Sequence, residues 1–203
     1  MNKIKKLLYL KSFGYDFVDF NIDMDKYEFD FSNLQNQIKN CRLCNLSKNR
    51  ICSLIDSDVN YKKLMIVDNF AQKEENESYI LNSNNGKKLI WLLKKYLNIT
   101  KKDFYFSYLY KCFNYEKDDT FALKQCLPYF WNEIKLCKPK IVFILGKTTF
   151  NNMGFKNFEK LRGVFFQYHQ MWILPSFDIN FISKNPSFEQ DFIDDLKKLK
   201  ALL

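Results

Sequence analysis

Short apolar runs that alternate with longer segments of helical periodicity are the feature of this sequence that most limits its fold. Four of the runs predict β-strands: 63–67 (KLMIV), 104–109 (FYFSYL), 140–145 (KIVFIL) and 171–174 (MWIL). Apolar residues recur every three or four positions at 86–97 and at 121–136, and a last helical pattern covers 188–203. Strands that alternate with helices are typical of a parallel sheet covered by helices. We therefore expect an α/β fold.

The composition indicates a compact globular protein. The chain has 203 residues, of which 47% are hydrophobic, and this is enough to bury a core and to exclude a disordered or fibrous protein. No apolar run could span a bilayer, and the lysine-rich start lacks a continuous apolar signal segment. We therefore expect a cytoplasmic monomer with no membrane partner. The net charge of +9 favours polyanions such as nucleic acid, although abundant Lys and Asn are also typical of an AT-rich genome.

Residues 1–34 differ in pattern from the rest of the chain. Apolar residues from Ile4 to Leu10 alternate with lysines, and an aromatic stretch interrupted by aspartates follows. This pattern predicts an amphipathic helix and an irregular segment. We expect an N-terminal helical extension at 1–34, packed on a main domain at 35–203.

The cysteines suggest a metal centre. Because the chain has no recognisable secretion signal, we expect a reducing compartment, in which thiolate ligation of a metal explains six cysteines better than disulfides do. Cys41 and Cys44 form a C-x2-C pair, and Cys112 and Cys126 flank the same half of the predicted sheet. Four thiolates suit an iron–sulfur cluster or a structural zinc. Scattered core cysteines remain an alternative.

Four segments match the motifs of one protein family in order and spacing. Residues 41–50 (CRLCNLSKNR) contain C-x2-C followed by Leu and Arg, and residues 104–113 (FYFSYLYKCF) form a strand that ends in Lys-Cys. Residues 126–146 contain a Cys-x-Pro-Tyr helix, a Pro-Lys turn and a strand ending in Leu-Gly. Residues 174–186 (LPSFDINFISKNP) stand where the family has a His-Pro loop, and they end in the Asn-Pro that follows it. Over roughly residues 34–200, the chain resembles the iron–sulfur uracil-DNA glycosylases, called family 4.

The resemblance implies a fold, a partner and a cofactor. The fold would be a three-layer sandwich with a central four-stranded parallel sheet, and the partner would be single- or double-stranded DNA. The activity would be removal of uracil from DNA in base excision repair. The cofactor would be a 4Fe-4S cluster held by Cys41, Cys44, Cys112 and Cys126. Zinc fits less well, because four-thiolate zinc sites usually consist of two close C-x2-C pairs.

The resemblance also assigns the site residues, at the carboxyl ends of the strands, where open sheets bind ligands. The catalytic positions fall on Asp68, Asn69 and Asp178, and the base-binding positions on Phe70, Tyr79, Tyr108 and Asn180. Asn69 stands where the family has a water-activating Glu, Tyr108 where it has a uracil-binding Asn, and Asp178 where it has a His. The loop glycines are replaced by Asp68 and Gln72, which would reshape the approach of a ligand.

Two interpretations of these replacements stay open. Asp68 or Asp178 could orient water or stabilise a positively charged sugar, so that the chemistry is rebuilt around carboxylates. Alternatively, catalysis is lost or changed, because Asn69 cannot act as a general base and Asp178 adds negative charge beside an anionic leaving group. The electrostatic sign favours the second interpretation and leaves a non-catalytic DNA-binding or protein-interaction module as the alternative. Asp68 and Asp178 are also ordinary turn formers.

Two further features are expected to lie outside the catalytic centre. His169 falls in an aromatic-rich strand or hairpin pattern at 164–172 and matches no family histidine, so we expect it to lie on the surface or to pack. Arg162 and Gly163 resemble the family's Arg-Gly before the hairpin, and this resemblance makes Arg162 a candidate for contact with the DNA backbone.

Overall fold

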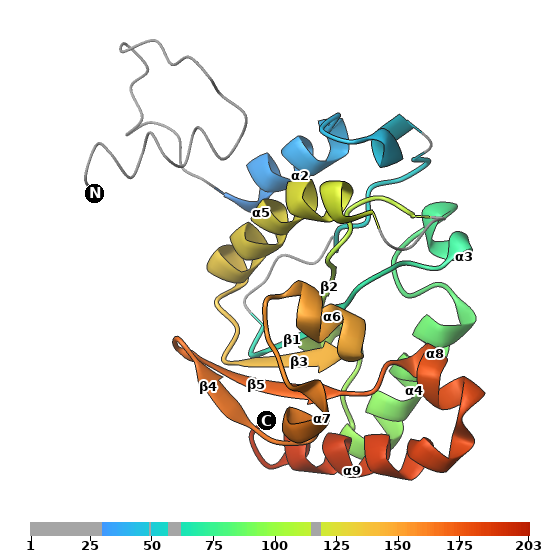
Figure 1. Ribbon diagram of the computed structural model, residues 1–203, viewed down its shortest axis with the longest axis vertical. Helices are drawn as coiled ribbons and strands as arrows, with labels where there is room; N and C mark the ends of the chain where they lie inside the picture. Colours follow the sequence, from blue (N-terminus) through green and yellow to red (C-terminus); the bar gives the residue numbers. More distant parts are fainter. Residues whose placement is uncertain (1–29, 49, 57–61, 115–118) are drawn as a thin grey trace.

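The structure is a computed structural model, and it describes residues 30–48, 50–56, 62–114 and 119–203 (Figure 1). Residues 1–29 of the predicted N-terminal extension lie outside the described residues, so the helix and the domain boundary expected there stay predictions. A helix, α2 (Phe31–Asn40), crosses the predicted boundary at residue 34. Asp30 caps it, because its carboxylate accepts a hydrogen bond of 2.7 Å from the backbone N–H of Asn33.

A five-stranded sheet forms the centre of the molecule. Its strands are β1 (Leu64–Asp68), β2 (Phe104–Tyr108), β3 (Ile141–Leu145), β4 (Phe166–Tyr168) and β5 (Met171–Ser176). They lie in the order β2-β1-β3-β5-β4. The four strands β1, β2, β3 and β5 run parallel, and β4 pairs antiparallel with β5. The predicted α/β fold and its four parallel strands are confirmed.

The sheet has one strand more than the expected four. β4 and β5 are joined by the two residues His169 and Gln170, and so short a connection folds the chain back into a hairpin. The aromatic-rich pattern before the last parallel strand therefore forms a short antiparallel edge strand.

Helices cover both faces of the sheet (Figure 1). The helices α4 (Asn84–Leu97), α8 (Ile179–Lys184) and α9 (Glu189–Lys200) pack on one face, and α5 (Thr120–Cys137), α6 (Lys147–Asn152) and α7 (Phe158–Leu161) pack on the other. Single-turn helices lie at Lys73–Asn76 (α3), Asn45–Lys48, Lys101–Asp103 and Pro186–Phe188. Because both faces are covered, the four parallel strands are largely apolar on both sides. No helix among the described residues is long and apolar enough to cross a membrane.

Three helices begin close to the carboxyl ends of the parallel strands. Ser83 caps α4, accepting a hydrogen bond of 3.0 Å from the backbone N–H of Gly86. Asp178 caps α8 in the same way, accepting a bond of 2.7 Å from Phe181. α6 follows Gly146, which has a φ of 87° and lies so close to Asp178 that a Cβ would be 2.7 Å from its Oδ2. Only glycine allows the loops after β3 and β5 to approach this closely.

Candidate functional site

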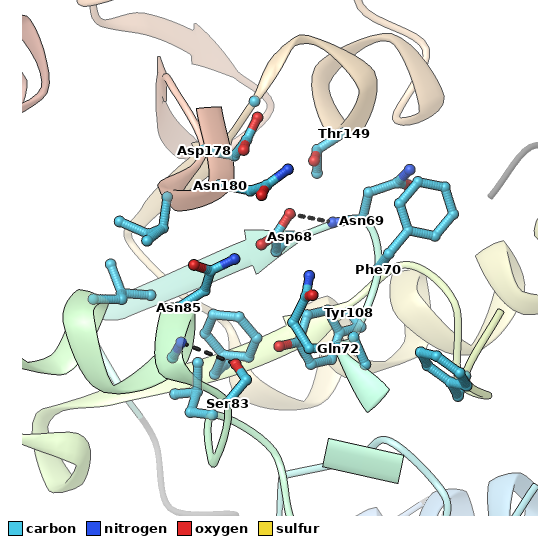
Figure 2. Close-up of a pocket in the computed structure, with 18 of the residues that line it drawn as sticks. Asp68, Asn69, Phe70, Gln72, Ser83, Asn85, Tyr108, Thr149, Asp178 and Asn180 are labelled. Atoms are coloured by element: carbon cyan, nitrogen blue, oxygen red, sulfur yellow. Dashed lines mark hydrogen bonds between the residues drawn. The ribbon is translucent and has the colours of Figure 1, made fainter. Parts of the chain in front are cut away.

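A cavity of 380 Å³ opens where the parallel strands end (Figure 2). Its lining comes from the end of β1 and the loop at 69–73, the start of α4, the end of β2 with residues 113 and 114, and the loops after β3 and β5. Carboxyl, amide and hydroxyl groups alternate with apolar side chains in its walls. Both the position and the volume are typical of ligand sites in parallel sheets.

Most of the predicted site residues meet at this cavity. Its lining contains Asp68, Asn69, Phe70, Tyr108, Asp178 and Asn180. Tyr79 does not contribute to the lining, because it lies in the turn before α4 with 66% of its surface exposed. The structure therefore does not bring this predicted base-binding residue to the cavity. Phe106 and Phe113, which were not predicted as site residues, are aromatic members of the lining.

Asp68 lies at the end of β1, half-buried in the cavity floor. Its Oδ1 accepts a hydrogen bond of 2.7 Å from the backbone N–H of Asn69. Burial raises the pKa of Asp68 to about 8, and the negative charge of Asp178 adds to the rise, whereas the bond from Asn69 opposes it. At neutral pH this carboxyl group is protonated and can donate a hydrogen bond to a ligand.

Asp178, which is expected at the position of the family's histidine, has a structural role: its carboxylate is engaged by the start of α8. Oδ1 caps α8 through the Phe181 backbone N–H, and Oδ2 packs against Gly146. Asp178 therefore has the turn-forming role that the sequence suggested for it. The carboxylate also acts on its neighbour, because its charge raises the pKa of Asp68.

Asn69, which is expected at the position of the family's water-activating Glu, has its side-chain oxygen bonded to a residue of α6. Oδ1 accepts a hydrogen bond of 3.1 Å from Nδ2 of Asn152. Its own Nδ2 is buried without a hydrogen-bond partner among the described residues, and the whole residue is 3% exposed. A buried donor of this kind marks a place where a water or a ligand oxygen is expected.

Tyr108 presents its ring to the cavity, while its hydroxyl is bonded elsewhere. The hydroxyl donates to Glu75 across 2.7 Å, and Glu75 has no exposed surface. Glu75 also accepts from the Ser83 hydroxyl and from the Gln72 backbone N–H, both at 2.7 Å. The loop after β1, the end of β2 and the cap of α4 are thus joined through one carboxylate. The Tyr108 hydroxyl is therefore already bonded within the protein and is not free to take the place of the amide expected from the family's asparagine.

Three amide side chains converge on the space around Asp68. Figure 2 shows those of Gln72, Asn85 and Asn180 pointing into the cavity from the loop after β1, from α4 and from α8. Each amide offers two N–H donors and one carbonyl acceptor. Asn180 was predicted from the family pattern, whereas Asn85 was not, because nothing in the local sequence distinguishes it from an ordinary first-turn residue of α4. Thr149 was also missed; it lines the cavity, and its hydroxyl donates to the Leu145 carbonyl.

Arg162, the predicted contact to the DNA backbone, is held within the protein. Its guanidinium lies 3.1 Å from Oδ2 of the buried Asp195 and covers the ring of Phe177 at 4.8 Å. The Ser176 hydroxyl donates to the same carboxylate at 2.7 Å. Gly163 has a φ of 70°, and a Cβ there would be 2.4 Å from Asp195 Oδ1. The Arg-Gly pair therefore ties α9 to the end of β5.

Comparison of the sequence with models of protein families identifies the family of the chain. A model of the uracil DNA glycosylase superfamily matches residues 61–200. The chain belongs to this superfamily. The matched region contains every residue that lines the cavity and begins after Cys41 and Cys44. No curated protein matches the chain. Membership relates the cavity to uracil glycosylase chemistry on DNA.

The four cysteines expected to hold a cluster in this superfamily member lie in one neighbourhood. Burial raises the pKa of Cys112, and the charges of Cys44 and Cys41 add to the rise. Burial likewise raises the pKa of Cys126 to about 12, with contributions from Cys112 and Cys44. Among the described residues, no group of three or more His, Cys, Asp or Glu side chains is close enough to hold a metal ion. The neighbourhood is thus wider than the ligand shell of a single ion.

Hydrogen-bond donors point at two of these sulfurs. Arg50 donates to Cys112 Sγ and the backbone N–H of Lys111 donates to Cys126 Sγ, both at 3.5 Å. Such donors stabilise negative charge on sulfur, as a cluster requires of its thiolates. The remaining cysteines lie apart from this neighbourhood. Cys52 donates to the Glu75 carbonyl at 3.2 Å, and Cys137 is a core residue that is 1% exposed.

Proposed function

We propose that this superfamily member binds single- or double-stranded DNA in base excision repair and holds one extruded base in the cavity. We further propose that it excises uracil at least about a thousandfold more slowly than a relative with the family's Glu and His. The proposal rests on the bonding and protonation of three polar side chains. Asn69 is bonded to Asn152, Asp178 caps α8, and Asp68 has a pKa of about 8. None of the three offers a free carboxylate base at neutral pH.

The cavity supports binding of a base through complementary polar groups. The edge of uracil alternates carbonyl oxygens with an N–H group. A protonated Asp68 can donate to a carbonyl, and the Asn85 and Asn180 amides can each donate or accept. Phe106 and Tyr108, which contact each other edge to face with 4.9 Å between ring centroids, supply an apolar floor. Enzymes that bind flipped bases combine edge hydrogen bonds with aromatic and apolar packing.

The same cavity lacks the group that activates water. Positioned general bases contribute factors of about 10² to 10⁴ in rate, and an amide at position 69 cannot accept a proton from water. Asp178 keeps a carboxylate where a cationic or neutral group would favour the departing uracil anion. These two losses account for the expected reduction in rate.

We also propose a 4Fe-4S cluster bound by Cys41, Cys44, Cys112 and Cys126. The cluster would supply structural cross-linking rather than chemistry at the base, since the cysteines lie in the segment after α2, after β2 and on α5. Arg50 would then hold the cluster in place from the segment after Asn45–Lys48, because it contacts both Cys112 Sγ and the Ile38 carbonyl at the end of α2.

A second candidate function is excision by a rebuilt carboxylate site. The proximity of Asp68 and Asp178 favours it, because burial, together with the negative charge of Asp178, keeps one proton on Asp68 up to a pH of about 8. Above that pH Asp68 ionises and becomes able to act as a base. Excision that rises through pH 8 and disappears in Asp68→Asn would establish this function.

Single-turnover cleavage of a uracil-containing single strand, with anisotropy of the same labelled strand, tests the proposed function. We expect binding at 50 mM salt, the low end of the usual titration range, and negligible cleavage at pH 7. Absence of binding would refute the DNA-binding proposal, and cleavage at the rate of an intact relative would refute the loss of catalysis.

Reversion of the replaced residues tests the assigned cause. Asn69→Glu alone should not restore excision, because Asp178 still opposes the uracil anion. Asn69→Glu with Asp178→His should restore measurable cleavage, and Asn152→Ala serves as a control that frees the Asn69 amide without adding a base. Equal cleavage by the control and the double variant would show that water activation is not what the wild type lacks.

A further inference from the structure

A second, larger depression lies at the other end of the sheet. It has a volume of 1090 Å³. Six residues from the end of α5 and the turn before β3 line it, together with the β4–β5 turn at 168–171; the six are Trp131, Ile134, Lys135, Lys138, Pro139 and Lys140. The base cavity is at the carboxyl ends of these strands, and this groove is at their amino ends. The two sites are therefore separated by the length of a five- or six-residue strand, about 17–20 Å.

Aromatic rings form a row in this groove. The centroid of Trp131 lies 6.3 Å from that of Tyr168, and the Tyr168 centroid lies 4.4 Å from that of His169. Trp131 and Tyr168 are half-buried, whereas His169 is exposed at the tip of the hairpin. His169 has a φ of 52°, a conformation that two-residue hairpin turns usually assign to Gly, Asn or Asp. The chain places an aromatic ring there despite the backbone cost.

All charged side chains that line the groove are lysines. Its lining contains three lysines and no carboxylate. The side chains of Lys138 and Lys140 are exposed, and they make no ion pair with any carboxylate in the described part of the chain. Lys138 follows the end of α5, where a cation also stabilises the helix C-terminus. Lys140 lies beyond the helix and has no such role, so its ammonium is available to an anionic ligand.

We propose that this groove binds a single-stranded nucleic acid segment, with phosphates at Lys138 and Lys140 and bases stacked on Trp131, Tyr168 and His169. Basic grooves that carry aromatic side chains bind single strands in this way, because every base has a face that stacks. An acidic peptide would use the lysines but would leave the row of rings without a partner. The groove does not require a base in the cavity, so it extends the proposed function without depending on it.

The test measures binding of an oligothymidine, which contains no uracil, by full-length protein at 50 to 200 mM salt. Lys138→Gln with Lys140→Gln should weaken binding and reduce the slope of log K against log salt by about 1.4, that is 0.7 for each lost phosphate contact. The matched control is Lys94→Gln with Lys95→Gln, which removes two exposed charges from α4. The control should keep the wild-type slope.

Stacking has a separate readout. Oligothymidine should quench tryptophan fluorescence in the wild type and in Trp91→Phe, and the quenching should be lost in Trp131→Phe, which keeps an aromatic ring in the fold. An unchanged salt slope in the groove variant, or quenching that persists without Trp131, would overturn the proposal. Displacement by polyglutamate with no binding of oligothymidine would overturn it in favour of an acidic protein segment. Asn85→Ala and Asn180→Ala change only the cavity. If they weaken binding of a uracil-containing strand but leave oligothymidine binding unchanged, the cavity and the groove are tested separately.

Discussion

The Tyr108 hydroxyl donates a hydrogen bond of 2.7 Å to Glu75, a carboxylate with no exposed surface. This bond joins the end of β2 to α3, which follows the loop after β1. Because Glu75 also accepts from Ser83 and Gln72, one side chain sets the relative position of three walls of the cavity.

Glu75→Gln should destabilise the protein and loosen the cavity. The replacement has one carbonyl oxygen and an amide that donates, so at least one of the three buried donors loses its acceptor. Leaving a buried donor unsatisfied costs about 1–3 kcal/mol. Urea unfolding measures the loss, and Tyr108→Phe, which removes one donor and leaves the other two bonds, is the control with the smaller effect. Equal stability of wild type and Glu75→Gln would show that this carboxylate does not organise the cavity.

Asp68 should make stability fall as pH rises from about 4 to about 8. Its folded pKa of about 8 lies above the ordinary value of 3.8, so between these values the folded protein holds a proton that the unfolded chain has released. Each pKa unit of difference corresponds to about 1.4 kcal/mol. Asp68→Asn should therefore gain stability relative to wild type at pH 8 and gain less at pH 5. Unfolding in urea at the two pH values checks this, and a gain that is equal at both would contradict it.

Lys111 forms a buried ion pair whose loss should be costly. Its ammonium lies 2.6 Å from Glu133 Oε2, and the two side chains are 2% and 0% exposed. Lys111→Met leaves the Glu133 charge without its partner, at a cost of about 3–5 kcal/mol. Lys147→Met breaks an exposed pair with Glu159 and should leave the unfolding midpoint unchanged. Similar midpoints for the two variants would show that burial does not determine the strength of these pairs.

The cysteine assignment predicts the iron content of anaerobically purified protein. We expect a brown protein with about four irons per chain. Cys112→Ser should lose the iron, whereas Cys137→Ser should keep it, because Cys137 is packed in the core away from the other four thiols. Metal analysis and absorbance near 400 nm, roughly where thiolate-to-iron transitions lie, provide the measurement. Zinc in place of iron, or equal loss from both variants, would refute the ligand set.

The parallel strands could be predicted from the sequence because each is a buried apolar run, and burial on both faces leaves a local pattern. The position of the cavity followed as well, since the ends of parallel strands meet at one edge of the sheet. The pattern at 164–172 predicted a strand or hairpin, but β4 was not counted in the expected sheet, because a three-residue segment does not indicate which strand it pairs with.

The roles of the site residues depend on contacts between distant segments. The chain order of Tyr108 and Glu75 does not reveal that the hydroxyl is bonded, and the raised pKa of Asp68 arises from burial and from Asp178, which lies 110 positions away. Arg162 is a further example. The sequence shows a cation, but only the fold shows that its guanidinium contacts Asp195 and Phe177. Apolar periodicity is a local property that the sequence determines by itself. Hydrogen bonding and protonation depend on which groups share a low-dielectric space, and only the tertiary structure decides that.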